Sequence, residues 1–470
     1  MHKEDRVFDV FGIVDIVLDL FEGSGAMAKQ ALAGMMVVLF VVSGSAARAD
    51  GVAESFTWNG GTADWDDTTA WTPTPDASDF GDTLDDFTAT SGQVRAYISP
   101  VFDAKLTIQG NGDPDAYSGA MLNFIYKHTG ITMTANDLHL DGGRFYYQRN
   151  SSCTVNGAMT IDPPTTGTHS WWDIRSDGKT MNFNASISGS GDLLVDNGGM
   201  QIKLSSANST YSGDWTLTGS HALWNNAANA MGTGSVTING SALTVNGDLT
   251  NLTGGVTVNS GGGIYGYASN NWGNVDMNGG LIEMTRSGNI TVTGTLDVQA
   301  PSTVRGRKSD AGKVFTLNTV FTGSEKMILN NPSGYSRVRV QNGGSTSFTG
   351  GWDILQGKLE LIHASGLGGG LGPGGVAAGP LYIDDSGLLD LGGSYGLHVF
   401  GLTLESQGAI AGSPEGTLYN VEALPSWSTY FSGSTANSTI TVYEELGIIP
   451  EPAGLGLLGL ALLGARRKRQ

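Results

Sequence analysis

The segment VTINGSALTVNGDLTNLTGGVTV, residues 236–258, decides the fold of this chain. It contains the triplets Val236-Thr237-Ile238, Leu243-Thr244-Val245 and Val256-Thr257-Val258, in which apolar residues flank a polar one. Such period-two alternation is typical of a half-buried β-strand. Asn239-Gly240 follows the first triplet, and its Gly provides the positive φ angle of a tight corner. The segment therefore predicts strand, turn, strand and turn within about twenty residues.

Triplets of this kind recur at a nearly even step. From Val236 to Ile440 they make ten steps over 204 residues, a mean of 20.4, and single steps run from 19 to 23 residues. A coil of this length cannot bury its apolar face alone, but stacked coils share one core and pair their backbone groups. We therefore expect an all-β chain folded as a right-handed parallel β-helix, with an antiparallel sandwich as the alternative. The triplets start at Leu106, Ile131, Cys153, Trp172 and Leu193, more loosely spaced, and then at Trp215, Val236, Val256, Val275, Leu296, Phe315, Val338, Leu359, Leu381, Leu402, Val421 and Ile440.

The composition excludes three classes of protein. The 470 residues include 25 Lys and Arg against 44 Asp and Glu, a net charge of −19, whereas a nucleic-acid-binding protein needs a basic face. Cys153 is the single cysteine, so the chain cannot form a disulfide framework. Gly accounts for 71 residues, about twice its ordinary share, and such a chain is unlike the Ala-, Leu-, Glu- and Lys-rich chains of helical bundles.

Residues 27–49 have the pattern of a helical secretory signal peptide. A positively charged start is followed by an apolar run and by small residues that end in Ala47-Arg48-Ala49. We therefore expect signal peptidase to cut after Ala49, so that Asp50 begins the mature chain. Residues 1–26 do not fit ahead of such a signal, and we interpret them as an upstream extension, with translation starting at Met27.

The next segment, residues 50–105, is rich in tryptophan. Trp58, Trp65 and Trp71 lie in it, and we expect them to form an N-terminal cap on the first coil. The chain has ten tryptophans, all after the signal peptide. Two interpretations are open for them: most fill the core, or exposed rings stack on the flat faces of sugars.

The C-terminal segment, residues 446–470, combines three features in order. Pro450-Glu451-Pro452 precedes an uncharged apolar run, which we expect to form a short transmembrane helix. The segment resembles the PEP-CTERM sorting signal of Gram-negative bacteria, and the resemblance implies that a membrane protease, exosortase, recognises and removes the tail. The basic residues that close the run, and that the positive-inside rule holds at the cytoplasmic face, are Arg466, Arg467, Lys468 and Arg469.

Two internal segments resemble the autotransporter-associated β-strand repeat. The first, residues 205–217, has the sequence SSANSTYSGDWTL, and NAMGTG follows it at residues 229–234. The second, residues 346–354, has the sequence TSFTGGWDI, and ASGLG follows it at residues 364–368. The resemblance implies a β-helical passenger displayed at the cell surface, which the C-terminal signal would deliver.

No motif in the sequence points to catalysis, and we expect a protein that is not an enzyme and holds no cofactor or metal. The histidines lack the spacing of a zinc site, and we interpret His139 as a strand-edge residue. Cys153 lies within an apolar triplet and is interpreted as a buried small hydrophobe. Three clusters either offer oxygens to Ca²⁺ or bond their own backbone in turns: Asp64, Asp66 and Asp67; Asp82, Asp85 and Asp86; and Asn111, Asp113 and Asp115.

The middle residue of each triplet should face solvent, and many of these residues are threonines. A flat column of Thr is the surface that an ice-binding β-helix presents, although Thr is also common on half-exposed strands. Acidic and basic residues interrupt this column, so ice binding is the lesser alternative. The threonines are Thr107, Thr132, Thr154, Thr216, Thr237, Thr257, Thr316, Thr403 and Thr441, and the interruptions are Asp276, Asp297, Arg339, Glu360 and Glu422.

These features predict an exported, acidic protein that is briefly anchored in the inner membrane and then reaches the cell surface or the extracellular matrix. We expect a structural or adhesive role, with polysaccharide binding or cleavage as the alternative. The expected partners are signal peptidase, an exosortase-type protease and extracellular polysaccharide, and no nucleic acid. The expected divisions are the extension (1–26), the signal peptide (27–49), the cap (50–105), the parallel β-helix (106–445) and the sorting signal (446–470).

Overall fold

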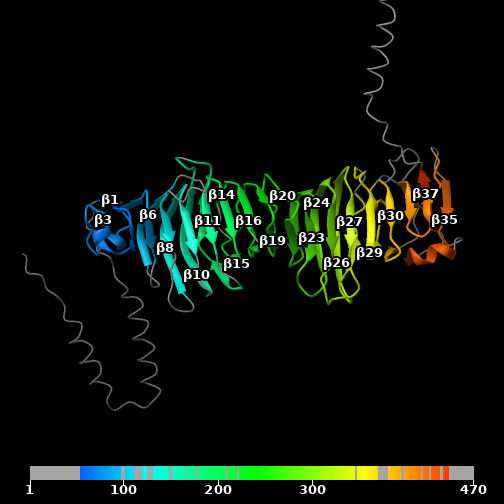
Figure 1. Cartoon of the computed structure of the whole chain (residues 1–470), viewed down its shortest axis with the longest axis horizontal. Coiled ribbons are helices and arrows are strands. Elements are labelled where there is room, and N and C mark those ends of the chain that lie inside the picture. Colours follow the sequence, from blue (N-terminus) through cyan, green and yellow to red (C-terminus); the bar gives the residue numbers. More distant parts are fainter. Residues whose placement is uncertain are drawn as a thin grey trace, which may run out of the picture.

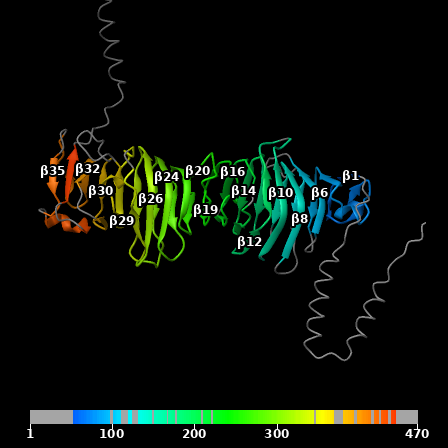
Figure 2. The ribbon, with the colours of Figure 1, turned by 180° about the vertical axis from the view of Figure 1, so that it is seen from behind.

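The chain forms one elongated body in which strands stack along the long axis, from β1 and β3 at one end to β35 and β37 at the other (Figure 1). The view from behind shows the same stacking on the opposite side (Figure 2). This computed structural model describes residues 53–96, 101–110, 119–123, 131–147, 151–165, 167–175, 178–207, 210–219, 222–344, 347–368, 379–392, 396–413, 417–422, 425–433 and 438–443.

The predicted all-β class is confirmed for these residues. No described helix is long and apolar enough to cross a membrane. The helical signal predicted at residues 27–49 and the transmembrane helix predicted within residues 446–470 both lie outside the described residues. The helical elements that are described are short 3₁₀ turns, namely η1 (Thr68–Ala70), η2 (Asp79–Gly81), η3 (Ala364–Leu367) and η4 (Pro425–Thr429).

Most strands belong to two ladders, A and B, in which every neighbouring pair is parallel. We call each strand of a ladder a rung. Ladder A runs through β1 (Ser55–Trp58), β4 (Asp86–Ala89), β6 (Val101–Gln109), β8 (Ile131–Asp141), β10 (Cys153–Asp162), β12 (Thr180–Phe183) with β13 (Ser186–Gly189), β15 (Gln201–Leu204), β17 (Ala222–Asn225), β19 (Ala242–Val245), β21 (Gly263–Gly266), β23 (Leu281–Met284), β25 (Ser302–Arg305), β27 (Met327–Asn330), β29 (Trp352–Leu361), β30 (Leu381–Ile383) and β33 (Leu402–Leu404).

Ladder B alternates with ladder A along the chain. From β14 to β27 each strand pairs with the second strand after it, because the strand between them belongs to the other ladder. Ladder B runs through β2 (Thr62–Asp64), β5 (Gln93–Arg95), β7 (Met121–Asn123), β9 (Arg144–Tyr147), β11 (Ser170–Ile174), β14 (Leu193–Asn197), β16 (Trp215–Gly219), β18 (Val236–Ile238), β20 (Val256–Asn259), β22 (Asn270–Asn278), β24 (Ile290–Ala300), β26 (Val314–Gly323), β28 (Arg337–Val340), the second half of β29, β31 (Gly387–Leu391) and β36 (Phe431–Gly433).

The predicted register holds in the middle of the chain. Val236 pairs with Val256, Val256 pairs with Val275, and Val275 pairs with Leu296. Because each of these steps changes the position by a whole coil, the same face of every strand stays buried. The even step of the triplets therefore describes rungs β18 to β24.

The predicted register is wrong at the step from Leu296 to Phe315, whereas Phe315 pairs with Val338 and Val338 with Leu359 as predicted. Leu296 pairs with Phe321, and Phe315 pairs with Ile290. The reason is that β24 and β26 are long strands that each carry two successive segments, and Gly294, with a φ of +126°, lies between the two segments of β24. The triplet at Phe315 therefore occupies a different side of the coil from the triplet at Leu296.

The last predicted rungs are also placed differently. Leu359 pairs with Leu389, whereas Leu381 pairs with Trp352, since β29 contributes its first half to ladder A and its second half to ladder B. Ile440 pairs with Leu397 in a separate three-stranded sheet of β32 (Gly396–Phe400), β35 (Thr417–Asn420) and β37 (Thr439–Tyr443). Val421 lies outside the strands. Antiparallel strands β3 (Trp71–Thr72) and β34 (Gly408–Ile410) pair with β1 and β33.

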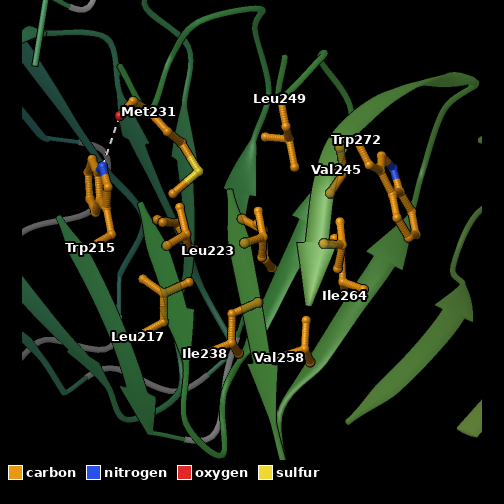
Figure 3. Close-up of a cluster of buried hydrophobic side chains, with 14 of the residues drawn as sticks. Trp215, Leu217, Leu223, Met231, Ile238, Val245, Leu249, Val258, Ile264 and Trp272 are labelled. Atoms are coloured by element: carbon orange, nitrogen blue, oxygen red, sulfur yellow. Dashed lines mark hydrogen bonds between the residues drawn. The ribbon is translucent and has the colours of Figure 1, made fainter. Parts of the chain in front are cut away.

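One apolar core runs through the body between the ladders. Figure 3 shows side chains from successive rungs meeting there, among them Leu217, Leu223, Ile238 and Ile264. Each of these four is at most 1% exposed. Full burial of such a side chain contributes about 1.5–3 kcal/mol. Since a side chain of one rung packs on the next rung, no coil has a core of its own.

The two segments that resemble each other in sequence pack in the same way. A Cβ built on Gly232 would lie 2.0 Å from the carbonyl oxygen of Tyr211, and a Cβ built on Gly368 would lie 2.3 Å from that of Phe348. Both glycines have a positive φ, and both face the aromatic residue of the segment before them. The two segments therefore make the same close contact between coils, although Trp215 belongs to ladder B and Trp352 to ladder A.

The aromatic residues of these segments lie in the core. Tyr211 meets Trp215 edge-on, with ring centroids 5.3 Å apart, and its hydroxyl donates to the carbonyl of Gly191 at 2.7 Å. Trp215 Nε1 donates to the carbonyl of Met231 at 2.9 Å, the bond drawn in Figure 3. The first segment thus provides aromatic core residues together with polar partners for their buried groups.

Candidate functional site

The residues predicted to direct export lie at the two ends of the chain. All of them are outside the described residues. The export residues are Ala47, Ala49 and Asp50 at the signal cleavage site and Pro450, Glu451, Pro452, Arg466, Arg467, Lys468 and Arg469 in the sorting signal.

Tryptophan exposure separates the two interpretations left open by the sequence. All ten tryptophans are described, and nine are at most 7% exposed, including Trp58, Trp65 and Trp71 in the first coils. Trp224 is different because it points outward from β17 and is half-buried. The core interpretation is therefore confirmed for eight tryptophans. Trp171 is buried outside the core beneath Arg144, and Trp224 is the one available to a ligand.

Trp224 belongs to a row of side chains on the outer face of ladder A, which we call the aromatic–cation stripe: Lys203, Trp224, Tyr267 and Arg286. The Nζ atom of Lys203 lies 5.1 Å from the centroid of the Trp224 ring. The Trp224 and Tyr267 rings lie 4.8 Å apart, and the guanidinium carbon of Arg286 lies 5.2 Å from the Tyr267 centroid. Both contacts to cations are within the range of cation–π attraction.

Tyr265 lies beside the stripe on β21. A Cβ on Gly263 would lie 3.0 Å from Cε2 of Tyr265, so the ring lies over a position where the sheet has no side chain. Burial, and then the charge of Glu283, raise the pKa of Tyr265. Glu283 is itself paired with Arg305, at 2.6 Å from its Nη2 atom. Tyr265 is therefore a neutral aromatic surface at neutral pH.

Sequence reasoning singled out Trp224 only as one of ten tryptophans and did not identify Lys203, Tyr267 or Arg286. A partial signal was present, because Trp224 and Tyr265 occupy outward positions in apolar-flanked segments. The contacts that form the stripe join residues 19 to 43 positions apart in the sequence, which no local pattern reports.

His139 lies between two carboxylates on ladder A. Its Nδ1 atom is 2.7 Å from Asp162 and its Nε2 atom is 3.0 Å from Asp137. It lies within β8, on the outward face, and not at a strand edge as predicted. A protonated His139 would donate to both carboxylates and connect β8 with β10.

Asp276 and Asp297 face each other on adjacent rungs of ladder B. Burial, and then the charge of Asp297, raise the pKa of Asp276. Asp297 accepts hydrogen bonds from Thr322 Oγ1 at 2.8 Å and Gln299 Nε2 at 3.0 Å. The two carboxylates therefore form a pair of like charges. Hydrogen-bond donors stabilise the anion of Asp297, so the anion of Asp276 is the less stable of the two.

The predicted threonine column is real but short. Thr216, Thr237 and Thr257 are in register on consecutive rungs of ladder B, and Asp276 and Asp297 continue the same column. Thr316 was expected to face solvent and is instead buried, at 5% exposure. Carboxylates therefore replace the flat threonine surface after three rungs.

The described acidic clusters use their oxygens within the fold. Asp67 accepts the backbone N–H of Thr69 at 3.0 Å, and Asp82 accepts that of Leu84 at 2.9 Å. Asp85 accepts the N–H of Glu54 at 2.8 Å. Among the described residues no three His, Cys, Asp or Glu side chains are placed to hold a metal ion, and Asn111, Asp113 and Asp115 lie outside that part of the chain.

Cys153 is buried at 3% exposure, as its triplet predicted. Burial raises the pKa of its thiol to about 12. A thiol in this environment is a poor nucleophile at neutral pH, because the thiolate is the reactive form.

A shallow hollow of about 310 Å³ lies farther along ladder A. Asp353 and Tyr382 line it from β29 and β30, and Lys326 Nζ lies 3.1 Å from Asp353 Oδ1. Its cation is therefore already neutralised, unlike the cations of the aromatic–cation stripe.

Comparison with known proteins identifies the C-terminal segment. Residues 449–470 match the family described as the PEP-CTERM protein-sorting motif. The chain carries a PEP-CTERM sorting signal. Such a signal implies an exported protein that is sorted through the membrane with processing by an exosortase-type protease, as the tail predicted. No curated protein and no solved structure matches the chain.

Proposed function

We propose that the body of this exported protein is a right-handed parallel β-helix that serves as a structural or adhesive element of the cell surface or extracellular matrix. The observation that carries the proposal is the continuous parallel pairing of both ladders, from β1 to β33 and from β2 to β36. Ladder B has sixteen strands, and their fifteen steps correspond to a rod of about 72 Å at the spacing of paired strands. A rod with one shared core resists local unfolding, since each rung is held by two neighbours.

The two aromatic segments, residues 205–217 and 346–354, support this proposal. We interpret them as autotransporter-associated β-strand repeats, whose resemblance implies a passenger displayed outside the cell. In this proposal the PEP-CTERM tail anchors the chain briefly in the inner membrane and is removed near Pro450, and the body performs no catalysis.

The test is fractionation of the producing bacterium with an antibody against the body. The wild-type protein is expected in the surface or matrix fraction without its tail, as shown by mass spectrometry of the C-terminal peptide. Replacing Pro450, Glu451 and Pro452 by Ala should leave the protein in the membrane fraction with the tail attached. A matched control replaces the exposed residues Lys308 and Lys313 by Ala and should behave as the wild type.

Two results would contradict the proposal. One is a triple Ala variant that is distributed between the fractions like the wild type, which would show that Pro450, Glu451 and Pro452 are not needed for sorting. The other is release of reducing ends from matrix polysaccharide by the purified protein, which would favour the enzymatic alternative. A strain that lacks the protein should form a less cohesive matrix, and expression of the wild type should restore it.

A further inference from the structure

The outer face of ladder A presents a row of rings and cations that the structural role does not require. We propose that the aromatic–cation stripe binds an anionic polysaccharide, with sugar rings on Trp224 and Tyr267 and acidic groups beside Lys203 and Arg286. This inference deepens the proposed function, on which it rests for the location of the protein outside the cell.

The backbone holds the stripe in position over five consecutive rungs, β15 to β23. Lys203 and Trp224 are direct partners in the ladder. Tyr267 and Arg286 follow the ends of β21 and β23, where the N–H of Tyr267 still donates to the carbonyl of Val245 at 3.0 Å. Four steps of the ladder correspond to about 19 Å, enough for a short run of sugar residues.

The charge on the stripe is available to a ligand. Among the described strand residues, Lys203 is the cation that has no carboxylate within ion-pair distance, and Arg286 is exposed and likewise lacks one among the described residues. The paired strand cations are Arg95, Lys105, Arg144, Arg305, Arg337, Arg339 and Lys358.

The unpaired state of Lys203 is informative because the chain is acidic. With 44 Asp and Glu against 25 Lys and Arg, a cation on a strand has many possible partners. Lys203 and Arg286 lie against ring faces instead, which keeps them beside the aromatic surface. An acidic group of a ligand would complete the pairing that the protein does not supply.

The aromatic part of the stripe favours sugars as the ligand. Trp224 and Tyr267 are half-buried, so each keeps part of its ring open at a fixed angle. Tyr265 widens this surface over Gly263, and Arg305 neutralises Glu283 next to it, so that no free carboxylate of Glu283 repels the ligand. Large flat rings with a fixed orientation suit the apolar faces of pyranose sugars.

The small number of cations distinguishes an anionic polysaccharide from nucleic acid as the ligand. Double-stranded DNA carries a charge about every 1.7 Å, and its binding requires a protein to neutralise many phosphates. The stripe offers two cations, which are connected through the Trp224 and Tyr267 rings by contacts of 4.8–5.2 Å, on a body of net charge −19. A polymer with sparse carboxylates meets less repulsion from such a body than a nucleic acid does.

The experiment measures binding of the purified exported protein to polygalacturonate, with a neutral β-glucan and single-stranded DNA as comparison probes. The wild type is expected to bind polygalacturonate, and the affinity should fall as NaCl rises. Trp224→Ala should weaken binding about tenfold, and Trp224→Phe should retain most of it. The double variant Lys203→Gln and Arg286→Gln should bind weakly and lose the salt dependence.

The controls separate binding from folding and from net charge. Lys313→Gln removes one exposed cation outside the stripe and should bind as the wild type. Circular dichroism should show the same strand content for all variants, since Trp224 is half-exposed. Equal binding of the Trp224→Ala variant, or tighter binding of DNA or neutral glucan than of polygalacturonate, would overturn the inference. Correct sorting to the matrix without polysaccharide binding would refute ligand binding at the stripe but not the proposed function. Polysaccharide binding by a protein that is never exported would refute the proposed function.

Discussion

Replacing Gly232 by Ala tests how closely successive coils pack. Gly232 has a φ of +79°, and a Cβ on it would lie 2.0 Å from the carbonyl oxygen of Tyr211. That oxygen accepts the N–H of Thr233 at 2.8 Å, so it cannot retreat without weakening a bond between coils. The substitution should therefore disturb the stacking and not only the local turn.

The expected loss of stability has two parts. An Ala in the left-handed region costs about 1–2 kcal/mol. Inserting a methyl group into a filled site costs about 1–3 kcal/mol more. Gly232→Ala should thus lower the free energy of unfolding by about 2–5 kcal/mol.

Gly240 provides a matched control. Its φ is +69°, but a Cβ there would meet nothing within 4 Å. Gly240→Ala should therefore cost only the conformational part, about 1–2 kcal/mol. The difference between the two variants isolates the contact between coils.

The assay is urea unfolding of both variants and the wild type, followed by tryptophan fluorescence. Trp215 is a local reporter because its Nε1 atom donates to the carbonyl of Met231, next to Gly232. Equal losses of stability in the two variants would refute the close packing inferred from the structure.

Three further predictions concern the polar and buried groups. Burial and the charge of Asp297 raise the pKa of Asp276, so its carboxylate destabilises the folded state at neutral pH. Asp276→Asn should therefore raise the free energy of unfolding by about 0.5 kcal/mol at pH 7. It should give no gain at a pH below 3.8, the ordinary pKa of an Asp side chain, and urea midpoints at both pH values would show this difference. The side chain of Asn259 donates a hydrogen bond to Asn239 at 2.6 Å and accepts one from Asn278 at 2.8 Å. Asn259→Ala should therefore lower the free energy of unfolding by about 1 kcal/mol in the same assay. An unchanged free energy would mean that water replaces these two hydrogen bonds. Cys153 should resist a thiol reagent at pH 8 and react once urea unfolds the chain, whereas rapid labelling of the folded protein would contradict its burial.

Local patterns predicted much of the fold. Alternation in Val236-Thr237-Ile238 predicts which side chains point inward, because successive residues of a strand face opposite sides. The step to Val256 and Val275 follows from coils of equal length. Buried tryptophans such as Trp215 agree with their apolar neighbours in the sequence.

The register failed where the coil changes length. Phe315 fits the triplet pattern as well as Phe321 does, and a period-two pattern is compatible with any rung. The choice depends on the bend at Gly294 and on the length of β24, which are properties of the whole coil. Sequence alone therefore predicts which side chains of a strand point inward more reliably than it predicts which strand pairs with it.

The aromatic–cation stripe shows the same division. Trp224 is a tryptophan among ten, and only stacking places it beside Tyr267, forty-three residues later in the chain. The export signals, by contrast, are linear segments that membrane enzymes recognise as sequence, and residues 449–470 carry theirs without the fold.

The amino-acid sequence by itself determined the all-β class, the inward-facing residues and the sorting signal, because each depends on neighbours within a few residues. The tertiary structure decided which rungs pair, which tryptophan faces solvent and which cations lack a carboxylate. These features depend on distances between coils, and such distances arise only when the coils stack.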